Sequence, residues 1–192
     1  MNEQELINGL LQKSEQAFRT LVDTHARRVY NTVLGFLQHP EEAEDITQEV
    51  FIQVYQSIQT FQGDASLSTW IYRISTTKAL EHLRNRKRKK RFAFIQSLFT
   101  GEGIDPAADK GHGEHPGVLL ENKEKASILF RALDQIPEKQ RVAFVLHNIE
   151  HLSYAEISSV MQVTIGSVES LIFRAKQNLR KILGDYYEKN KS

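Results

Sequence analysis

The side chains best placed to do chemistry in this sequence form a cationic run. Between Arg84 and Arg91, every residue except Asn85 is basic, so seven like charges fall within eight residues. Such charges repel one another, and a polyanion is the partner that best compensates them. A localisation-like patch, or a helix end whose cations favour the dipole, is the plainer interpretation. The run favours contact with nucleic-acid phosphates and comprises Arg84, Arg86, Lys87, Arg88, Lys89, Lys90 and Arg91.

Histidine and carboxylate side chains offer only weak metal-binding patterns. His112 and His115 flank Glu114, and His147 and His151 are four residues apart, but neither set completes the ligands that a metal site needs. The sequence also has no Gly-rich phosphate loop, no nucleophile elbow and no isolated carboxylate pair. We therefore expect neither a metal nor another cofactor, and no catalysis by the chain itself.

Composition narrows the class of protein and its compartment. The 192 residues include no cysteine, which excludes disulfides and thiolate metal sites and fits a reducing cytoplasm. No apolar run is long enough to cross a membrane, and Met1 leads into polar residues rather than a secretion signal. The net charge is only +1, but five acids crowd residues 41–49. We expect a cytoplasmic protein without membrane insertion that has separate surfaces for separate partners.

The apolar periodicity that must position these side chains is helical nearly throughout, and nothing indicates a strand. Ser14 can cap a helix that His39-Pro40 ends, and Pro40 suits the first turn of the next helix. After a break at residues 61–64, a further helix starts near Ser66 or Ser68 and leads into the basic run. The first half is therefore predicted to be a small helical bundle.

Helical periodicity disappears between the two halves. From about Phe94 to Glu121 the chain contains five glycines and two prolines, which favours a flexible linker. Residues 100–121 hold five acids and one base, a net charge of −4. So long a connection is unusual within one compact domain. We therefore predict an all-α protein of two small helical domains, residues 1–95 and 122–192, joined by a flexible acidic linker over residues 96–121.

The second half carries a helix-turn-helix pattern. Two helices, the second beginning at Pro137, precede a capping-box pair formed by Ser153 and Glu156. A tight turn follows at residues 162–164, and Thr164 can cap a longer helix that Gly184 ends. Such a pair braces its second helix so that its first turns reach base edges in the major groove. A plain four-helix bundle with a solvated basic face is the alternative.

The predicted recognition helix has one apolar face and one polar face. Val168, Leu171, Ile172 and Ala175 recur at the spacing of a buried stripe. Basic residues toward the C-terminal half suit phosphates. The residues left to face DNA are Thr164, Ser167, Glu169, Ser170, Phe173, Arg174 and Gln177.

Several spaced motifs in the second half resemble region 4 of the extracytoplasmic-function (ECF) sigma factors, which belong to the sigma-70 family. The resemblance implies a four-helix helix-turn-helix domain that reads the −35 promoter element with its last helix. Gln162 replaces a glycine of the turn, Glu169 a basic residue and Leu171 an arginine, so base preference stays open. Glu169 can accept a hydrogen bond from cytosine N4. The matching segments are residues 136–141, 152–157, 163–170 and 173–175.

The first half is similar to region 2 of the same family. The string Asp45-x-x-Gln48-Glu49-x-Phe51 resembles the signature that docks on a coiled coil of the RNA polymerase β′ subunit. The resemblance implies that Asp45, Gln48, Glu49 and Ile52 bind polymerase, pairing with basic residues opposite. A solvated polar face is the plainer interpretation.

Residues 61–74 resemble the sigma segment that opens the −10 element and captures an unstacked base in a loop pocket. Aromatic side chains beside basic and small polar ones suit single-stranded DNA, although on spacing alone Trp70 is a buried anchor and Ile71 a core residue. Thr77 and Glu81 stand where the family has Asn and Asp, which leaves the −10 sequence open. The predicted −10 contacts are Phe61, Asp64, Ala65, Ser66, Ser68, Tyr72, Arg73, Arg84, Arg86, Lys87 and Arg88.

Together, the residues and the resemblance predict a sigma factor that directs promoter-specific initiation and helps to open the DNA. Its expected partners are core RNA polymerase, through the β′ coiled coil and the β flap, and promoter DNA, both duplex and single-stranded. An anti-sigma factor is a possible further partner, and the acidic linker is expected to mimic nucleic acid in a polymerase channel. A polymerase-independent helix-turn-helix regulator is the alternative. An enzyme acting on nucleic acid would need a catalytic cluster that the sequence lacks.

Overall fold

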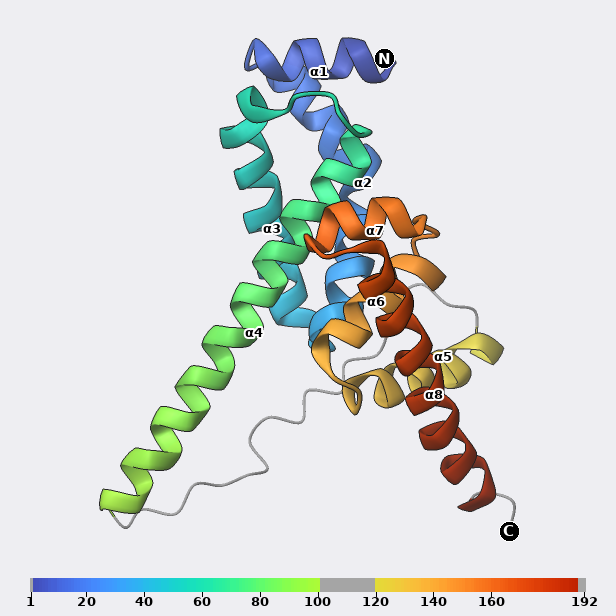
Figure 1. Ribbon diagram of the computed structural model, residues 1–192. Coiled ribbons are helices and arrows are strands. Elements are labelled where there is room, and N and C mark those ends of the chain that lie inside the picture. The colour runs from blue at the N-terminus through green and yellow to red at the C-terminus, as the bar shows by residue number, and fades with distance from the viewer. Residues whose placement is uncertain (1, 101–119, 190–192) are drawn as a thin grey trace.

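The computed structural model describes residues 2–100 and 120–189, and within these ranges the chain is helical with no β-strand (Figure 1). We call α1 to α4 the first module and α5 to α8 the second, and the all-α, two-module prediction is confirmed. Most of the predicted linker, residues 101–119, lies outside the described residues, as do His112, Glu114 and His115. The first module comprises α1 (Glu3–Leu11), α2 (Glu15–Leu37), α3 (Pro40–Ser57), a 3-10 turn η1 (Ile58–Thr60) and α4 (Leu67–Thr100), and the second comprises α5 (Leu120–Asp134), α6 (Glu138–Asn148), α7 (Tyr154–Met161) and α8 (Ile165–Lys189).

Helix α1 is absent from the sequence-based prediction. It begins with a capping box in which the side chain of Asn2 accepts a hydrogen bond from the Glu5 N–H at 2.8 Å, and the Glu5 carboxylate accepts one from the Asn2 N–H at 2.9 Å. The helix lies across α2 at close range, because a Cβ on Gly9 would lie only 2.7 Å from Cβ of Ala17. Glycine at this position therefore permits the crossing of α1 and α2.

The chain turns between α2 and α3 as predicted. Ser14 caps α2, its hydroxyl oxygen accepting the Ala17 N–H at 3.4 Å. Gln38 ends the helix with a left-handed backbone, φ 59°, and Pro40 takes the first position of α3, where no N–H donor is needed. The apolar faces of α2, α3 and α4 meet in a core that includes Val33, Phe36, Val50, Val54 and Ile71.

Helix α4 differs from its prediction in two respects. It continues through residues 96–100, which were predicted to belong to the linker. Residues 84–100 contain neither glycine nor proline, so nothing there breaks the helix. Trp70 is half-buried beside Phe61, with ring centroids 5.4 Å apart, whereas Ile71 is the deeply buried residue. The buried anchor of this segment is therefore Ile71 rather than Trp70.

The second module contains the predicted helix-turn-helix. Ser153 and Glu156 form the capping box that begins α7, and Thr164 caps α8 by accepting a first-turn N–H at 3.2 Å. Gln162 has φ 54°, a left-handed conformation that explains why glycine suits this turn in the family pattern. The prediction that Gly184 ends α8 is wrong, because the helix continues through Lys189. A single glycine weakens a helix without necessarily breaking it.

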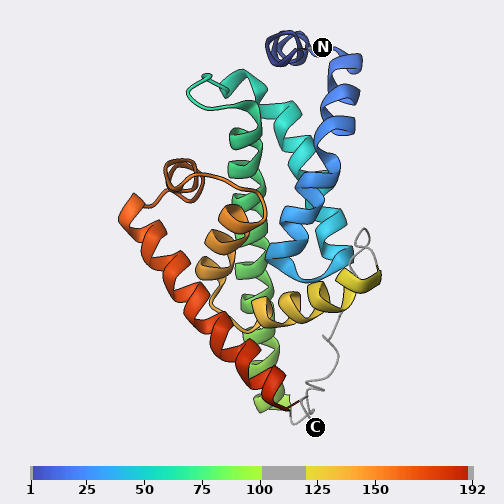
Figure 2. The ribbon, with the colours of Figure 1, turned by 90° about the vertical axis from the view of Figure 1, so that its right-hand side faces the viewer.

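The two modules pack against each other along two pairs of helices. Helix α7 lies against α4, and α6 lies against α2 (Figures 1 and 2). The second contact is close at Gly35 of α2, where an added Cβ would lie 3.1 Å from Cγ1 and 3.2 Å from Cγ2 of Val145 in α6. The missing side chain of Gly35 therefore lets α2 and α6 approach each other closely.

Candidate polymerase and promoter interfaces

The recognition helix α8 presents the predicted DNA-facing residues to solvent. Val168, Ile172 and Ala175 are almost completely buried on its inner side, and Leu171 is partly buried. Phe173, directly after the buried Ile172, keeps 59% of its surface exposed. The helix is thus held by one face and open on the other. The exposed residues include every predicted contact, namely Thr164, Ser167, Glu169, Ser170, Phe173, Arg174 and Gln177.

The sequence-based site omits Ile165, the first residue of α8. This side chain is exposed directly after the Thr164 cap, and a Cβ on the following Gly166 would have no neighbour within 4 Å, so this edge of the helix is open. An exposed apolar side chain here suits the methyl group of thymine. Its position could have revealed it, because the first residues of a recognition helix reach base edges.

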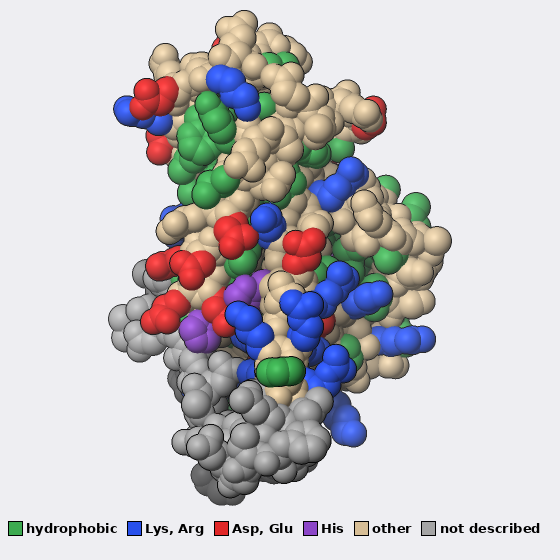
Figure 3. Space-filling model, turned by 90° about the vertical axis from the view of Figure 1, so that its left-hand side faces the viewer, with side chains coloured by type: hydrophobic (Ala, Val, Ile, Leu, Met, Phe, Trp, Pro, Cys, Tyr) green, Lys and Arg blue, Asp and Glu red, His purple; other side chains and the backbone are tan. Residues whose placement is uncertain are grey.

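Helix α3 presents a second exposed surface. Its inner side carries the buried residues Ile46, Val50 and Val54. Its outer side carries the predicted polymerase contacts, all of them exposed, and we call these four residues the docking surface. Figure 3 shows acidic side chains gathered beside a band of Lys and Arg, on the side of the molecule where α3 and α4 lie. The docking surface comprises Asp45, Gln48, Glu49 and Ile52, the last of which is 55% exposed.

The loop of residues 61–66, between η1 and α4, carries the predicted base pocket. Gly63 has φ 79°, which a residue without a Cβ adopts at no steric cost. The loop is anchored where α4 begins, because Glu3 of α1 accepts the Leu67 N–H at 3.1 Å and Ser66 accepts the Thr69 N–H at 3.1 Å. Asp64 and Ser66 are exposed, while Phe61, Ala65 and Ser68 are half-buried.

Tyr72 and Arg73 of α4, predicted beside this pocket, are turned against the second module. Tyr72 is 5% exposed, and its hydroxyl donates to Oε2 of Glu150 at 2.7 Å. Burial and then this hydrogen bond raise the pKa of Tyr72 well above its usual value, so the hydroxyl stays a donor at neutral pH. The guanidinium of Arg73 donates to the hydroxyl of Ser159 in α7. The sequence did not predict a role for Glu150, because this residue lies between α6 and α7, where there is no helical periodicity to indicate burial.

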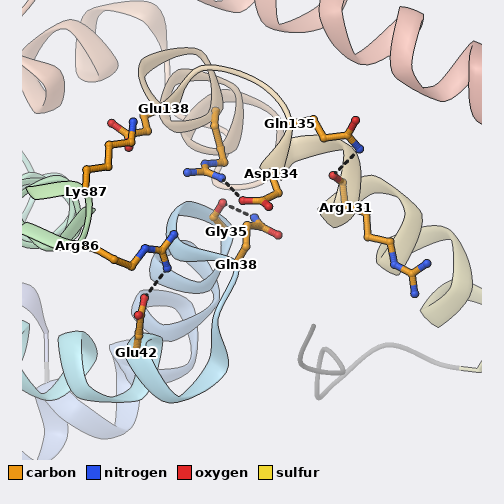
Figure 4. Close-up of polar contacts among 10 residues, drawn as sticks. Gly35, Gln38, Glu42, Arg86, Lys87, Arg131, Asp134, Gln135 and Glu138 are labelled. Carbon is orange, nitrogen blue, oxygen red and sulfur yellow. Dashed lines mark hydrogen bonds and ion pairs between the residues drawn. The ribbon is translucent and has the colours of Figure 1, made fainter. Parts of the chain in front are cut away.

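The basic run of α4 contains both paired and exposed side chains (Figure 4). Arg86 Nη1 lies 2.9 Å from Oε2 of Glu42 in α3, and Lys87 Nζ lies 2.8 Å from Oε1 of Glu138 in α6. The Lys87 ammonium remains mostly exposed, so water and salt screen its pair with Glu138. The run therefore still presents positive charge to solvent, and its exposed residues include Arg84, Arg88, Lys89 and Arg91.

His147 packs against an aromatic ring and lies near a backbone carbonyl oxygen. Its ring lies 5.0 Å from that of Tyr154, and its Nδ1 lies 3.1 Å from the carbonyl oxygen of Leu152. Across residues 2–100 and 120–189, no three His, Asp or Glu side chains are grouped to hold a metal ion. Among the described helices, none combines the length and apolarity needed to cross a bilayer.

Fold and surfaces define a class of protein: an all-helical protein of two modules, with a helix-turn-helix in the second module and an exposed acidic and polar surface on α3 of the first. Residues 21–89 match the family model of sigma-70 region 2, and residues 127–179 match that of sigma-70 region 4. The chain is 32% identical to the RNA polymerase sigma-H factor of Pseudomonas aeruginosa, over 94% of this chain and 93% of that protein. It is 28% identical to the ECF RNA polymerase sigma-E factor of Escherichia coli, over 92% of each. The chain belongs to the sigma-70 family and is a sigma factor of the ECF type.

Two solved structures share the fold. One is the sigma factor RpoE from Bartonella quintana in complex with the anti-sigma factor NepR, with a TM-score of 0.67 and 20% identity over 87% of this chain and 96% of that one. The other is CnrH in complex with the cytosolic domain of CnrY, with a TM-score of 0.67 and 18% identity over 95% and 97% of the two chains.

Proposed function

We propose that this sigma factor directs core RNA polymerase to promoters by holding two DNA elements at once. Helix α8 reads the −35 element as duplex, while the loop of residues 61–66 and the adjoining face of α4 receive the −10 element as unpaired strand. The docking surface on α3 binds the β′ coiled coil of the polymerase, and the second module binds the β flap.

The observation that carries this proposal is the exposure of two different surfaces on the two modules of one chain. The docking surface is acidic and polar, with Ile52 at 55% exposure, and it has no use in a protein that binds only duplex DNA. A polymerase-independent regulator would need the face of α8 alone. The two surfaces together favour a factor that joins the polymerase to a promoter.

Reading of the −35 element rests on the exposed polar residues of α8. Arginine can donate two hydrogen bonds to guanine, and glutamate can accept one from cytosine, each good pairing discriminating by about 1–3 kcal/mol. Arg174 and Glu169 are exposed and available for these roles. Ile165 and Phe173 add exposed apolar surface for thymine methyl groups.

Capture of the −10 strand rests on the exposed loop and the basic run. Removing a base from its stack costs a few kcal/mol, so a pocket that holds the extruded base stabilises the open duplex. The small polar residues Asp64 and Ser66 are exposed at this loop. The exposed arginines and lysines of α4 neutralise the phosphates of the strand without reading its sequence.

An anti-sigma factor is part of the proposal. RpoE and CnrH, which share this fold, were each solved with another protein, the anti-sigma factor NepR and the cytosolic domain of CnrY. We infer that a protein of this kind binds the present chain and restrains it.

Transcription by core polymerase tests the proposal. Purified core enzyme with this protein should initiate at a defined set of promoters that core enzyme alone ignores. Asp45→Lys should abolish competition for core enzyme against the housekeeping sigma factor, because it reverses a charge on the docking surface. Glu41→Lys makes the same charge change at another exposed position of α3 and should compete normally.

Arg174→Ala separates DNA reading from polymerase binding. It should bind core enzyme as the unmodified protein does but lose or change promoter choice. Specific duplex binding by the free protein, with no association with core enzyme and no effect on start sites, would establish the polymerase-independent regulator instead.

A further inference from the structure

We propose that the second module holds this sigma factor in a closed state in which Tyr72 and Arg73 of α4 cannot bind the −10 strand, and that the buried carboxylate of Glu150 holds this state together. The proposal rests on the assignment of α4 to that strand. The modules must then separate before Tyr72 and Arg73 can bind promoter DNA.

Glu150 reaches from the second module into the first. Its side chain is 5% exposed, and its Oε2 accepts the hydroxyl proton of Tyr72 at 2.7 Å. Its Oε1 lies 2.6 Å from the hydroxyl of Thr32 in α2, and the guanidinium of Arg28 approaches Oε2 at 3.4 Å. A carboxylate is rarely buried unless it is paired. All three partners belong to the first module, so Glu150 is satisfied in its buried position only when the modules are together.

The contacts beside Glu150 continue along α4. Thr69 donates to Oε1 of Glu156 at 3.3 Å, and Arg73 donates to Ser159. Lys87 pairs with Glu138 further along the same helix (Figure 4). Tyr72, Arg73 and Lys87 are all residues assigned to the −10 strand. Tyr72 is buried against the second module and Arg73 is bonded to it, so these two side chains cannot contact a DNA strand while the modules are together.

In the described part of the chain, the interface between the two modules leaves a buried hydrogen-bond donor without a partner. Among the described residues, the buried Nε of Arg73 has no hydrogen-bond partner. An unsatisfied buried donor lowers the stability of the state that contains it. In the closed state Nε of Arg73 therefore lacks a partner among residues 2–100 and 120–189, and in the open state water or a phosphate can accept its hydrogen bond.

Closure leaves other surfaces available. The docking surface on α3 and the polar face of α8 are exposed while Tyr72 is buried. The polymerase and the −35 duplex can therefore engage the closed protein first. Their binding to two separate modules can then draw the modules apart and uncover α4, because ligands that bind the open state better shift the equilibrium toward it.

A reversible covalent lock tests this proposal directly. A Cβ on Gly35 would lie 3.8 Å from Cβ of Val145, within the range of a disulfide, and the chain has no cysteine of its own. The full-length double variant Gly35→Cys with Val145→Cys should form an intramolecular disulfide on mild oxidation. Each single variant, treated in the same way, is the control for the effects of substitution and oxidant.

Binding of a fluorescent −10 non-template oligonucleotide and promoter-directed transcription by core polymerase are then measured with oxidised and reduced protein. The oxidised protein should lose both, the reduced protein should regain both, and binding of a −35 duplex should not change. Equal activity of the oxidised and reduced forms, or failure of the two cysteines to cross-link in the free protein, would overturn the proposal. If the reduced protein and the single variants also lack strand binding and transcription, the result contradicts the proposed function rather than the closed state.

The reverse change should open the protein without a cross-link. Glu150→Ala removes the buried acceptor, so a larger fraction of molecules is open and apparent affinity for the −10 oligonucleotide rises, by roughly 5- to 30-fold. Glu41→Ala removes an exposed carboxylate of α3 and should leave the affinity unchanged. Unchanged or weaker strand binding by Glu150→Ala would contradict closure by this residue.

Discussion

Helices α4 and α8 are both assigned to promoter DNA, yet the structure leaves one open and covers the other. On α8 the predicted base-reading residues are exposed, whereas on α4 Tyr72 is buried and Arg73 is bonded to the second module. In the proposed function, the two helices bind DNA by different physical interactions. A duplex-reading face gains affinity from matched base edges, but an aromatic and basic face stacks on any single strand. If α4 binds single strands in this way, covering Tyr72 and Arg73 would limit unspecific binding by the helix with the weaker sequence selectivity.

The largest expected effect on stability comes from removing a buried side chain that packs α8 against the core. Ile172→Ala deletes a side chain that is 2% exposed and should lower the free energy of unfolding by about 2–5 kcal/mol, through lost burial and a residual cavity. Phe173→Ala changes the next residue, which is 59% exposed, and should alter stability by no more than about 0.5 kcal/mol while weakening −35 binding. Denaturant unfolding and duplex titration measure the two effects. Similar losses of stability would show that the face of Phe173 is not free.

The covered face of α4 predicts a smaller effect on stability. Tyr72→Phe keeps the ring but removes the donor to Glu150, and it should destabilise the closed protein by about 1.5–3 kcal/mol, the range for a hydrogen bond to a charged group. Tyr30→Phe, which alters a half-buried tyrosine near Glu44 of α3 within the first module, should cost less. The midpoints of denaturant unfolding give the comparison. Equal effects would argue against a special role of the Tyr72 hydroxyl.

The basic run should affect binding rather than stability. Replacing Arg84, Arg88 and Lys89 by alanine should weaken promoter binding across sequences and flatten its salt dependence. The slope of log affinity against log salt should fall by about 0.7 for each lost contact to single-stranded phosphate. The control removes the same number of charges from the exposed residues Arg19, Arg27 and Lys139. A slope that the first variant leaves unaltered would refute phosphate binding by the run.

The smallest effect concerns acid stability at the start of α7. Hydrogen bonds from the Ser153 side chain and backbone, and then from Thr69 across the module boundary, lower the pKa of Glu156 below its ordinary value of 4.5. A lowered pKa contributes stability that is present above pH 4.5 and is lost as the pH falls through the folded-state pKa. The difference in thermal midpoint between the unmodified protein and Glu156→Gln should shrink over that fall in pH. A difference that stays constant would exclude this carboxylate as the cause.

Periodicity and capping predicted most of the individual helices, because both are local. The helix-turn-helix follows from Ser153, Glu156 and Thr164, and the exposed face of α8 follows from the buried stripe around Val168 and Ile172. Helix α1 could also have been predicted from the sequence, since Asn2 and Glu5 have the spacing of a capping box. The contact between the two modules could not have been predicted from the sequence. Glu150 lies outside any helix, and its partners Thr32 and Tyr72 are 118 and 78 residues away in the chain, so no local pattern joins them.

The distance between the modules tests most directly whether this sigma factor opens to act. Because the chain has no cysteine, two can be introduced at the exposed positions Gln56 in α3 and Lys139 in α6 and labelled with a donor and an acceptor fluorophore. Energy transfer is measured in the free protein, with core polymerase, and with polymerase and promoter together. We expect high transfer in the free protein and a clear fall once polymerase and promoter are bound. Transfer that is already low in the free protein, or that stays unchanged in the complete complex, would contradict a closed state that must open.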